Sequence, residues 1–209
     1  MIKVEHIVTW GFEHAIRGMR NPLNSWDRSD SKFDYDKMCL GENDLALMQK
    51  LYAAGQPHRK YLRQIFVSMD ITAPLYWWKE FDTYKVGTTA NSCSTMHKLT
   101  AKEFTIEDFS FEDCDRWTKD VVCSCIINAL NMNRLKYLET KDKEIWRQMV
   151  QLLPSSYNQR RTVTMTYENV MNILDYRQGH KLSEWNEYCD ILMAGLPYVA
   201  DLRNATQKR

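Results

Sequence analysis

The clearest pattern in the chain is an alternation of apolar and polar residues over 65–72. Its apolar members are Ile65, Val67, Met69 and Ile71, and a polar or aromatic residue follows each of them. Successive side chains of a β-strand point to opposite faces, so the alternation predicts a strand with one buried face. A strand of this kind is expected in the centre of a sheet.

Helical spacing covers most of the remaining chain. Apolar residues three or four positions apart predict helices over 12–20, 74–81, 143–153, 165–177 and 183–196. Asn43 is expected to cap a further helix that ends near Gly55. Ser110 and Asp113 resemble a capping box ahead of the longest helix, which runs to about Thr140. With one more strand over 3–9, helices dominate and strands are few.

Two polar segments separate these elements. The stretch 21–43 is rich in Asn, Asp, Ser and Lys and has no periodicity, so it is expected to be functional or poorly ordered. The stretch 87–94 is small and polar and is predicted to be a loop. It follows a strand and a helix, and hydroxyl and amide groups just beyond rigid elements often form a ligand site. A solvated loop without a ligand is the alternative.

Composition narrows the class of protein. The chain is 44% hydrophobic and has seven Trp, which suffices for a sizeable core and argues against disorder. Lys and Arg total 28 against 27 Asp and Glu, so no general attraction to nucleic acid or to an anionic membrane is expected. No apolar run approaches the roughly 20 residues that span a bilayer, and no secretory signal is visible, so a cytoplasmic location is predicted. Nothing marks a linker, which predicts a single domain over 1–209.

The six Cys are expected to be reduced thiols, because the chain shows no export signal. Cys123 and Cys125 form a C-x-C pair without a second pair or a His at metal-site spacing, so no metal site is predicted. Cys125 instead belongs to a stripe of residues at helical spacing that is predicted to face the core. The stripe consists of Cys114, Trp117, Val121, Cys125, Ala129 and Met132.

The region after the central strand resembles the signature region of the flavin-dependent thymidylate synthases. That family has an A-P-x(5)-Q-x-x-R-H-R run followed by N-E-x-S-x-R-Y. Here the first run begins at Ala73-Pro74 and continues through Glu80 to Thr83-Tyr84-Lys85. The second corresponds to Asn91-Ser92-Cys93-Ser94-Thr95-Met96-His97, after one inserted residue in the stretch 86–90.

The resemblance extends in both directions. Upstream, the family's G-H-E-x-P-x-E-H stretch falls on 57–64, where His58 matches its first histidine and Gln64 stands at its second. Downstream, Leu153-Pro154, the stretch 167–177 and Glu184-Trp185 are similar to its l-P, N-x-R-x-x-x-N-F-x-x-L-R and Q-W-E motifs. Asn172 and Arg177 keep the family's residues. Together these short matches cover most of the chain between His58 and Glu187.

The resemblance implies an α/β (α+β) fold in which a small, mostly antiparallel sheet packs with several long helices, and a homotetramer. It implies a flavoprotein methyltransferase that methylates dUMP reductively, with FAD as cofactor and with NADPH and methylenetetrahydrofolate as co-substrates. By the same resemblance, the nucleotide should contact Glu80, Asn91, Ser92, Ser94 and Arg177. The flavin should contact Gln64, Thr83, Tyr84, Lys85 and Asn172.

The chain departs from the family at charged positions. The R-H-R triplet, which in the family grips the flavin and the nucleotide, is Thr83-Tyr84-Lys85, and the Arg after Ser94 is Met96. A charge-assisted hydrogen bond contributes about 1.5–3 kcal/mol, which a hydroxyl or thioether does not replace. Two alternatives therefore stand beside the enzyme: a nucleotide-binding protein or enzyme for a less anionic pyrimidine, and a non-catalytic oligomeric homologue.

Local alternatives also stay open for single residues. Asn172 and Arg177 are five residues apart, which places them about 140° apart around a helix, so they are expected to flank a site. Near a helix C-terminus, Arg177 is equally consistent with a solvated residue that complements the helix dipole. Ser94 is equally consistent with a turn hydroxyl. The pair Trp77-Trp78 is expected to belong to the core or to a subunit contact.

Overall fold

The computed structural model describes residues 2–34 and 37–207, and within them the chain forms two compact units. The first unit comprises the described residues of 1–3, 70–83 and 90–162, and the second those of 4–69, 84–89 and 163–209. The predicted α/β class is confirmed, with a small antiparallel sheet and several helices. The prediction of a single domain over 1–209 stays a prediction.

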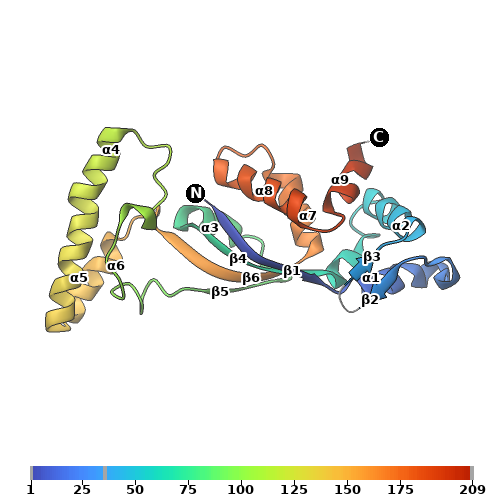
Figure 1. Ribbon diagram of the computed structural model, residues 1–209, viewed down its shortest axis with the longest axis horizontal. Coiled ribbons are helices and arrows are strands. Elements are labelled where there is room, and N and C mark those ends of the chain that lie inside the picture. The colour runs from blue at the N-terminus through green and yellow to red at the C-terminus, as the bar shows by residue number, and fades with distance from the viewer. Residues whose placement is uncertain (1, 35–36, 208–209) are drawn as a thin grey trace. The chain divides into compact units, whose positions relative to one another are not determined.

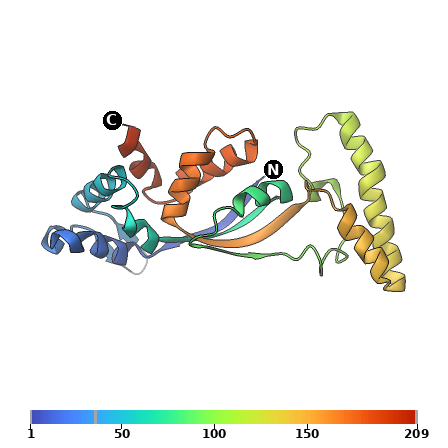
Figure 2. The same cartoon turned by 180° about the vertical axis from the view of Figure 1, so that it is seen from behind.

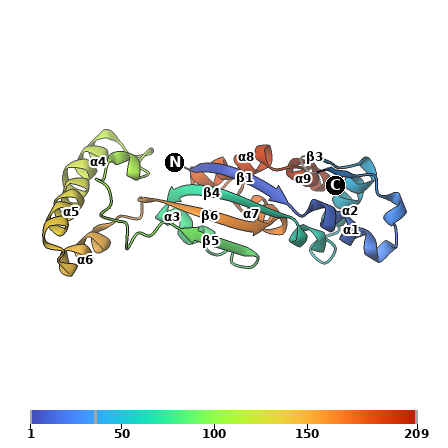
Figure 3. The ribbon, with the colours of Figure 1, turned by 60° about the horizontal axis from the view of Figure 1, so that its bottom comes forward.

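Four strands form the main sheet, in the order β1 (Lys3–Trp10), β4 (Phe66–Pro74), β6 (Asn158–Thr166), β5 (Thr88–Ser92). Figure 3 shows the strands side by side in this order. The predicted alternation is confirmed in β4, where Val67, Met69 and Ile71 are buried and the residues between them are half-buried. Since β4 lies between β1 and β6, the prediction of a central strand is also confirmed.

The helices of the second unit largely follow the predicted spacing. They are α1 (Phe12–Arg20), α2 (Glu42–Ala53), α7 (Tyr167–Arg177), α8 (Ser183–Gly195) and α9 (Val199–Gln207). A five-residue 3-10 helix, η3 (Lys60–Gln64), leads into β4. The predicted helix over 165–177 starts later, because 158–166 is strand β6 and Thr166 is the N-cap of α7, where its Oγ1 accepts a hydrogen bond from the Asn169 amide.

The first unit contains a long helical rod, α4 (Arg116–Val121), the π-helix η5 (Val122–Ile127) and α5 (Asn128–Thr140), with α6 (Lys143–Leu152) beside it (Figures 1 and 2). The rod ends at Thr140 as predicted. The predicted capping box at Ser110 and Asp113 is wrong for this helix, because Asp115 is the N-cap and its side chain accepts from the Thr118 amide.

The predicted core stripe on this rod is also wrong. Trp117 is 74% exposed and Met132 is 67% exposed, whereas Val122, Ile127 and Leu130 form the core with Met149 of α6. The cause lies in η5, because a π-helix uses i to i+5 hydrogen bonds and takes more residues per turn than an α-helix. The buried residues Val122 and Ile127 are thus five positions apart, about one turn of the π-helix, and a stripe drawn at a constant 3.6 period misses them. All six Cys are free thiols.

The short helix α3 (Leu75–Phe81) supplies the aromatic core of the first unit. Trp77 and Trp78 are buried, as expected, and their rings pack against Phe81. The Trp78 Nε1 donates to the Gln159 carbonyl at 2.9 Å, and the guanidinium of Arg161 lies 4.2 Å from the Trp78 ring centre. The segment after α3 was predicted to be a loop over 87–94, but 88–92 is strand β5, because the backbone of β6 supplies it with a hydrogen-bonding partner.

The polar stretch 21–43, which was expected to be functional or poorly ordered, is ordered where the structure describes it. It contains the short 3-10 helices η1 (Asn21–Leu23) and η2 (Trp26–Arg28) and the antiparallel pair of β2 (Lys32–Asp34) and β3 (Lys37–Cys39). The order comes from the buried carboxylate of Asp44. It pairs with the Arg20 Nε at 2.6 Å and accepts from the hydroxyls of Ser29 and Ser31 and from two backbone amides.

The start of α2 differs from the expected cap at Asn43. The helix begins at Glu42 with Gly41 as N-cap, and the Asp30 carboxylate accepts from the amides of Asn43 and Asp44 at 2.9 and 3.1 Å. A Cβ at position 41 would collide with the Asp30 side chain. Glycine is therefore required there for Asp30 to reach the helix end.

We predict that Asp44→Asn lowers the free energy of unfolding by about 3–5 kcal/mol at neutral pH, because it leaves the Arg20 guanidinium buried without its counter-charge. Burial alone would raise the pKa of Asp44, but the hydrogen bonds from Ser31, Arg20, Ser29 and the Asp30 backbone outweigh it and lower the pKa. The stabilisation is thus fully present above the ordinary value of 3.8 and is lost as the pH falls through the folded-state pKa.

Urea denaturation at a series of pH values measures both effects. The difference between the wild type and Asp44→Asn should shrink as the pH falls below 3.8. Asp190→Asn, an exposed position on α8, is the matched control and should stay within about 0.5 kcal/mol of the wild type. A difference that is small at neutral pH, or that is the same at every pH, contradicts the prediction.

Candidate functional site

Arg177 ends α7 and lies against two aromatic rings of the second unit. Its Cζ is 4.8 Å from the centre of the Trp185 ring and 5.7 Å from that of the Tyr84 ring. Its Nε donates to the Tyr84 hydroxyl at 3.1 Å. Trp185 is fully buried and the other two are half-buried, so the cation–π contacts fix the position of the guanidinium. Arg177 is therefore an oriented side chain and not a freely solvated one.

A tight turn between α7 and α8 completes this cluster. Gly179 has a φ of +78°, which favours glycine, and its amide donates to the Asn186 Oδ1 at 2.8 Å. The Asn186 amide group donates back to the His180 carbonyl at 2.9 Å. The turn thus places the His180 Nε2 at 3.2 Å from the Arg177 Nη1. Neither Asn186 nor His180 was singled out from the sequence.

The segment that carries Tyr84 and Lys85 is anchored to the start of α7. The buried Asn169 side chain donates to the Val86 carbonyl at 2.6 Å and to the Thr88 Oγ1 at 2.7 Å. The Thr166 amide also donates to the Gly87 carbonyl at 3.1 Å. Lys85 is exposed and has no ion-pair partner among the described residues. The anchor therefore fixes the backbone around Lys85, an exposed cation that directly follows Tyr84 in the sequence.

A charge reversal appears in the first turn of α7. Where the family's downstream motif has Arg, this chain has Glu168, which is buried and paired with Arg63 from η3. The Arg63 Nε and Nη2 donate to the two carboxylate oxygens at 2.5 and 3.1 Å. The motif predicts an arginine on α7, but the guanidinium at this place comes from Arg63 of η3. Sequence spacing could not have identified Arg63.

Gln64, expected at the flavin, lies at the end of η3 beside a cavity of about 520 Å³. The cavity has polar groups from His58, Lys60, Tyr61 and Gln64 and apolar walls from α1, α2 and η1. Its size lies within the usual range for ligand pockets, which are mostly apolar with a few polar groups. Asn172 is half-buried, and no described residue supplies its side chain with a hydrogen bond.

The remaining predicted residues belong to the first unit. The Thr83 hydroxyl donates to the Glu80 carbonyl at 2.7 Å, which caps the end of α3. Asn91 and Ser92 are exposed on β5. The Ser94 hydroxyl accepts from the amides of Met96 and His97 at 3.1 and 2.9 Å, as in the alternative of a turn hydroxyl.

Ser94 also borders a cavity of about 370 Å³ in the first unit. Arg160 and Lys102 line it, but the structure pairs Arg160 with Asp70 at 2.6 Å and Lys102 with Asp108. The structure thus brings Arg177 together with Tyr84 in one unit, and Thr83 with Glu80 in the other. That all the predicted residues contact one nucleotide and one flavin stays a prediction.

The fold is that of the flavin-dependent thymidylate synthases, as predicted. Among solved structures, thymidylate synthase X (ThyX) from Helicobacter pylori with FAD and dUMP matches with a TM-score of 0.73, over 99% of this chain and 100% of that one. A second structure of flavin-dependent thymidylate synthase ThyX from the same organism, complexed with FAD and dUMP, matches with a TM-score of 0.69, over 99% and 98%. Both are 16% identical to this chain, which shows a shared fold.

No family model and no curated protein matches the sequence. Within residues 2–34 and 37–207, none of the helices has the length and apolar character needed to cross a membrane. The same residues contain no group of three or more His, Cys, Asp or Glu side chains that could hold a metal ion.

We predict that Asn169→Ala lowers the free energy of unfolding by about 1–3 kcal/mol and increases hydrogen exchange in 84–89, because two buried hydrogen bonds are lost. Asn172→Ala, one turn later on the same helix, is the matched control for stability and should change it by less than about 0.5 kcal/mol. Urea denaturation and exchange mass spectrometry measure the two effects. Equal exchange in the two variants contradicts the anchoring role.

Proposed function

We propose that this protein is a divergent flavin-dependent thymidylate synthase that methylates dUMP reductively. Arg177 supports this most directly. It matches the family's arginine in sequence, and two aromatic rings hold it in place on a fold shared along 99% of the chain with ThyX structures that contain FAD and dUMP. An oriented guanidinium recognises a phosphate or a pyrimidine carbonyl through paired, charge-assisted hydrogen bonds.

The proposed nucleotide contacts combine one fixed cation with neutral groups. Arg177 supplies the charge, and Asn91, Ser92 and Ser94 supply amide and hydroxyl groups, with Glu80 at the end of α3 as an acceptor. Amides and hydroxyls satisfy the donors and acceptors of a uracil ring without adding charge. Affinity for the phosphate then depends more on Arg177 than in a site with several arginines.

The residues on the flavin side fit a flavin. The 520 Å³ cavity offers apolar walls for a ring and the Gln64 amide at its edge, while Lys60 and Lys85 are exposed cations suited to a diphosphate. Asn172, Thr83 and Tyr84 complete the proposed set. When bound, FAD supplies the hydride that it takes from NADPH. Methylenetetrahydrofolate would supply the one-carbon unit to C5 of dUMP, whose hydrogen would leave as a proton, and the hydride would reduce that unit to a methyl group with release of tetrahydrofolate.

A second candidate function is recognition of a less anionic pyrimidine. It is favoured by the positions where the family has charged residues and this chain does not. The Thr83 hydroxyl donates to the Glu80 carbonyl of its own helix end, and Ser92 and Met96 are exposed and uncharged. Deoxyuridine binding nearly as tightly as dUMP supports this candidate, and a strong preference for dUMP supports the synthase. A protein that binds both ligands without forming dTMP supports the third reading, a non-catalytic homologue.

We further propose that the chain assembles as a homo-oligomer, and a tetramer is the form that the resemblance implies. The second unit exposes apolar side chains on one face of its strands, where Val8 is 58% exposed and Trp10 is 44% exposed. The Trp10 ring stacks on Phe66 with ring centres 5.7 Å apart. Figure 3 shows these strands from the side that no helix covers. Exposed apolar side chains gathered on one strand in this way are typical of a protein contact.

We predict that the purified protein binds FAD and dUMP, and that Arg177→Ala weakens dUMP binding by about 10- to 100-fold, because a charge-assisted pair is lost. Arg177→Lys keeps the charge without the paired geometry and should fall between the two. Arg116→Ala removes a highly exposed arginine of α4 and should leave dUMP affinity unchanged. Calorimetry measures the affinity for dUMP, visible absorption measures bound FAD, and the rate of dTMP formation measures turnover.

The outcome that contradicts the proposal is a wild-type protein that takes up neither FAD nor dUMP. Equal dUMP affinity in the wild type and Arg177→Ala, with both variants folded by circular dichroism, likewise removes Arg177 from the site.

We predict that the wild type is a tetramer by size-exclusion chromatography with light scattering, and that Trp10→Glu yields a smaller species, because a charge cannot be buried in an apolar contact. Trp117→Glu, at an exposed tryptophan of the first unit, is the control and should leave the mass unchanged. A monomeric wild type contradicts the proposed assembly.

A further inference from the structure

An ion pair joins η3 to the first turn of α7, and each partner has the opposite charge to the residue in the family's motif. The upstream motif G-H-E-x-P-x-E-H, over 57–64, has Glu where this chain has Arg63. The downstream motif has Arg where this chain has Glu168. The two positions thus carry opposite charges both in the motifs and in this chain, with the signs exchanged. One change alone would have placed two like charges at these positions.

The geometry of the pair shows why the two changes belong together. The Arg63 Nε and Nη2 donate to the two carboxylate oxygens of Glu168, although the two residues lie 105 positions apart. The Glu168 side chain is 12% exposed, against 49% for Arg63. A bidentate pair fixes the direction of approach as well as the distance. A buried carboxylate that faced a second carboxylate would lose its counter-charge, which is strongly destabilising.

The pair is one of two contacts that hold the end of η3 against α7. The second is the Tyr167 amide, which donates to the Ile65 carbonyl at 2.9 Å. The two contacts lie on either side of Gln64 in the sequence, and η3 packs against both α1 and α7. A 3-10 helix of five residues has poorer hydrogen-bond geometry than an α-helix, so its position depends on such contacts.

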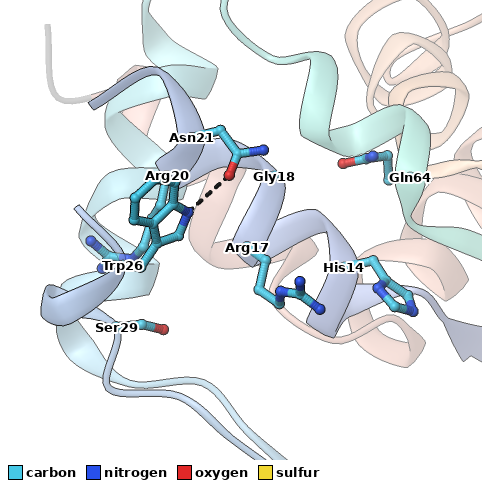
Figure 4. A pocket seen from close by; sticks show the side chains of 8 residues that line it. All are labelled: His14, Arg17, Gly18, Arg20, Asn21, Trp26, Ser29 and Gln64. Atoms are coloured by element: carbon cyan, nitrogen blue, oxygen red, sulfur yellow. Dashed lines mark hydrogen bonds between the residues drawn. The ribbon is translucent and has the colours of Figure 1, made fainter. Parts of the chain in front are cut away.

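Gln64 has little room on the side of α1. A Cβ at Gly18 would lie 2.6 Å from the Gln64 Oε1, and a Cβ at Gly11 would lie 2.2 Å from the Gln64 carbonyl oxygen. Figure 4 shows the Gln64 side chain directed toward α1 beside Gly18. Both glycines are therefore required for η3 to approach α1 this closely. A small displacement of η3 would move the Gln64 amide at the edge of the proposed flavin cavity.

We propose that Arg63 and Glu168 are positioning residues of the flavin site, which hold Gln64 and Lys60 of η3 at the 520 Å³ cavity whichever partner carries the positive charge. The inference rests on the proposed flavin function and adds two residues that act through η3. Neither of them is among the described residues that line the cavity. An exchange of both charges keeps the contact between the two elements, whereas it would reverse any direct recognition of an anion.

The test is a charge-exchange series on the full-length protein: Arg63→Glu, Glu168→Arg and the double variant with both changes. Each single variant places two like charges together and should weaken FAD binding roughly tenfold or more. The double variant restores an ion pair with the polarity of the motifs and should bind FAD within roughly threefold of the wild type. Arg63→Gln removes the charge without adding repulsion and should lie between the wild type and Arg63→Glu. Visible absorption and flavin fluorescence titrations measure the affinity.

Hydrogen exchange of the ligand-free proteins reports on η3 itself. Residues 60–64 should exchange faster in both single variants and at the wild-type rate in the double variant. The link through Gln64 is measured in a Gln64→Ala background, where Arg63→Gln should weaken FAD binding by a smaller factor than it does in the wild type. A pair that contributed only to general stability would give equal factors in the two backgrounds.

Matched controls separate positioning from a general loss of stability. Arg160→Glu breaks an ion pair of similar exposure in the first unit, where the Arg160 Nη2 lies 2.6 Å from the Asp70 carboxylate, and it should leave FAD affinity unchanged. Arg116→Glu makes the same change of charge at a highly exposed position of α4 and should also leave FAD affinity unchanged. Unfolding midpoints are measured for every variant, so that affinities are compared among folded proteins.

Three results overturn the proposal. The first is wild-type FAD affinity and exchange in the single variants, the second is a double variant as weak as the single ones, and the third is equal factors in the two Gln64 backgrounds. A wild type that takes up no FAD contradicts the proposed flavin function instead. The exchange rates then decide on the pair alone: fast exchange in the single variants with wild-type exchange in the double variant supports it, and any other pattern overturns it.

Discussion

The buried ion pair between Arg20 and Asp44 is the interaction on which the order of the second unit depends. One carboxylate accepts hydrogen bonds from α1, from Ser29 and Ser31 and from the backbone between them, and Asp30 then caps α2. Removal of one partner of a buried ion pair is strongly destabilising, so this part of the unit depends on the pair remaining intact. The same arginine borders a cavity beside α1 that His14, Arg17 and Trp26 also line, so the order of the described residues in 21–43 and the shape of that cavity have one cause.

The candidate site shows how a fold can be kept while its charges change. Arg177 is retained and fixed by Trp185 and Tyr84, and the tyrosine stands where the resemblance places a histidine between two arginines. Glu168 replaces an arginine, and Arg63 from another element neutralises it. These changes preserve packing and local charge balance, but they leave fewer cations for a phosphate. The proposed function therefore depends on a small number of oriented groups.

The sequence predicted the elements whose pattern is regular. The alternation in β4 and the bounds of α1, α6 and α8 follow from periodicities of two and 3.6, because burial of one face dictates them. The errors arise where another interaction overrides the local pattern: the π-helix buries Val122 and Ile127, five positions apart, in place of residues at 3.6 spacing, and pairing with β6 makes a strand of 88–92. Asn169 and Arg63 could not be found, because both act on residues about 80 to 105 positions away.

Hydrogen exchange of the protein with and without FAD and dUMP tests the central claim most directly, since it reports which backbone segments a ligand orders. The account predicts slower exchange in 60–64, 84–89 and 172–182 when both ligands are present, and in the last two segments with dUMP alone. Unchanged exchange in these segments, at ligand concentrations that saturate binding, would contradict it.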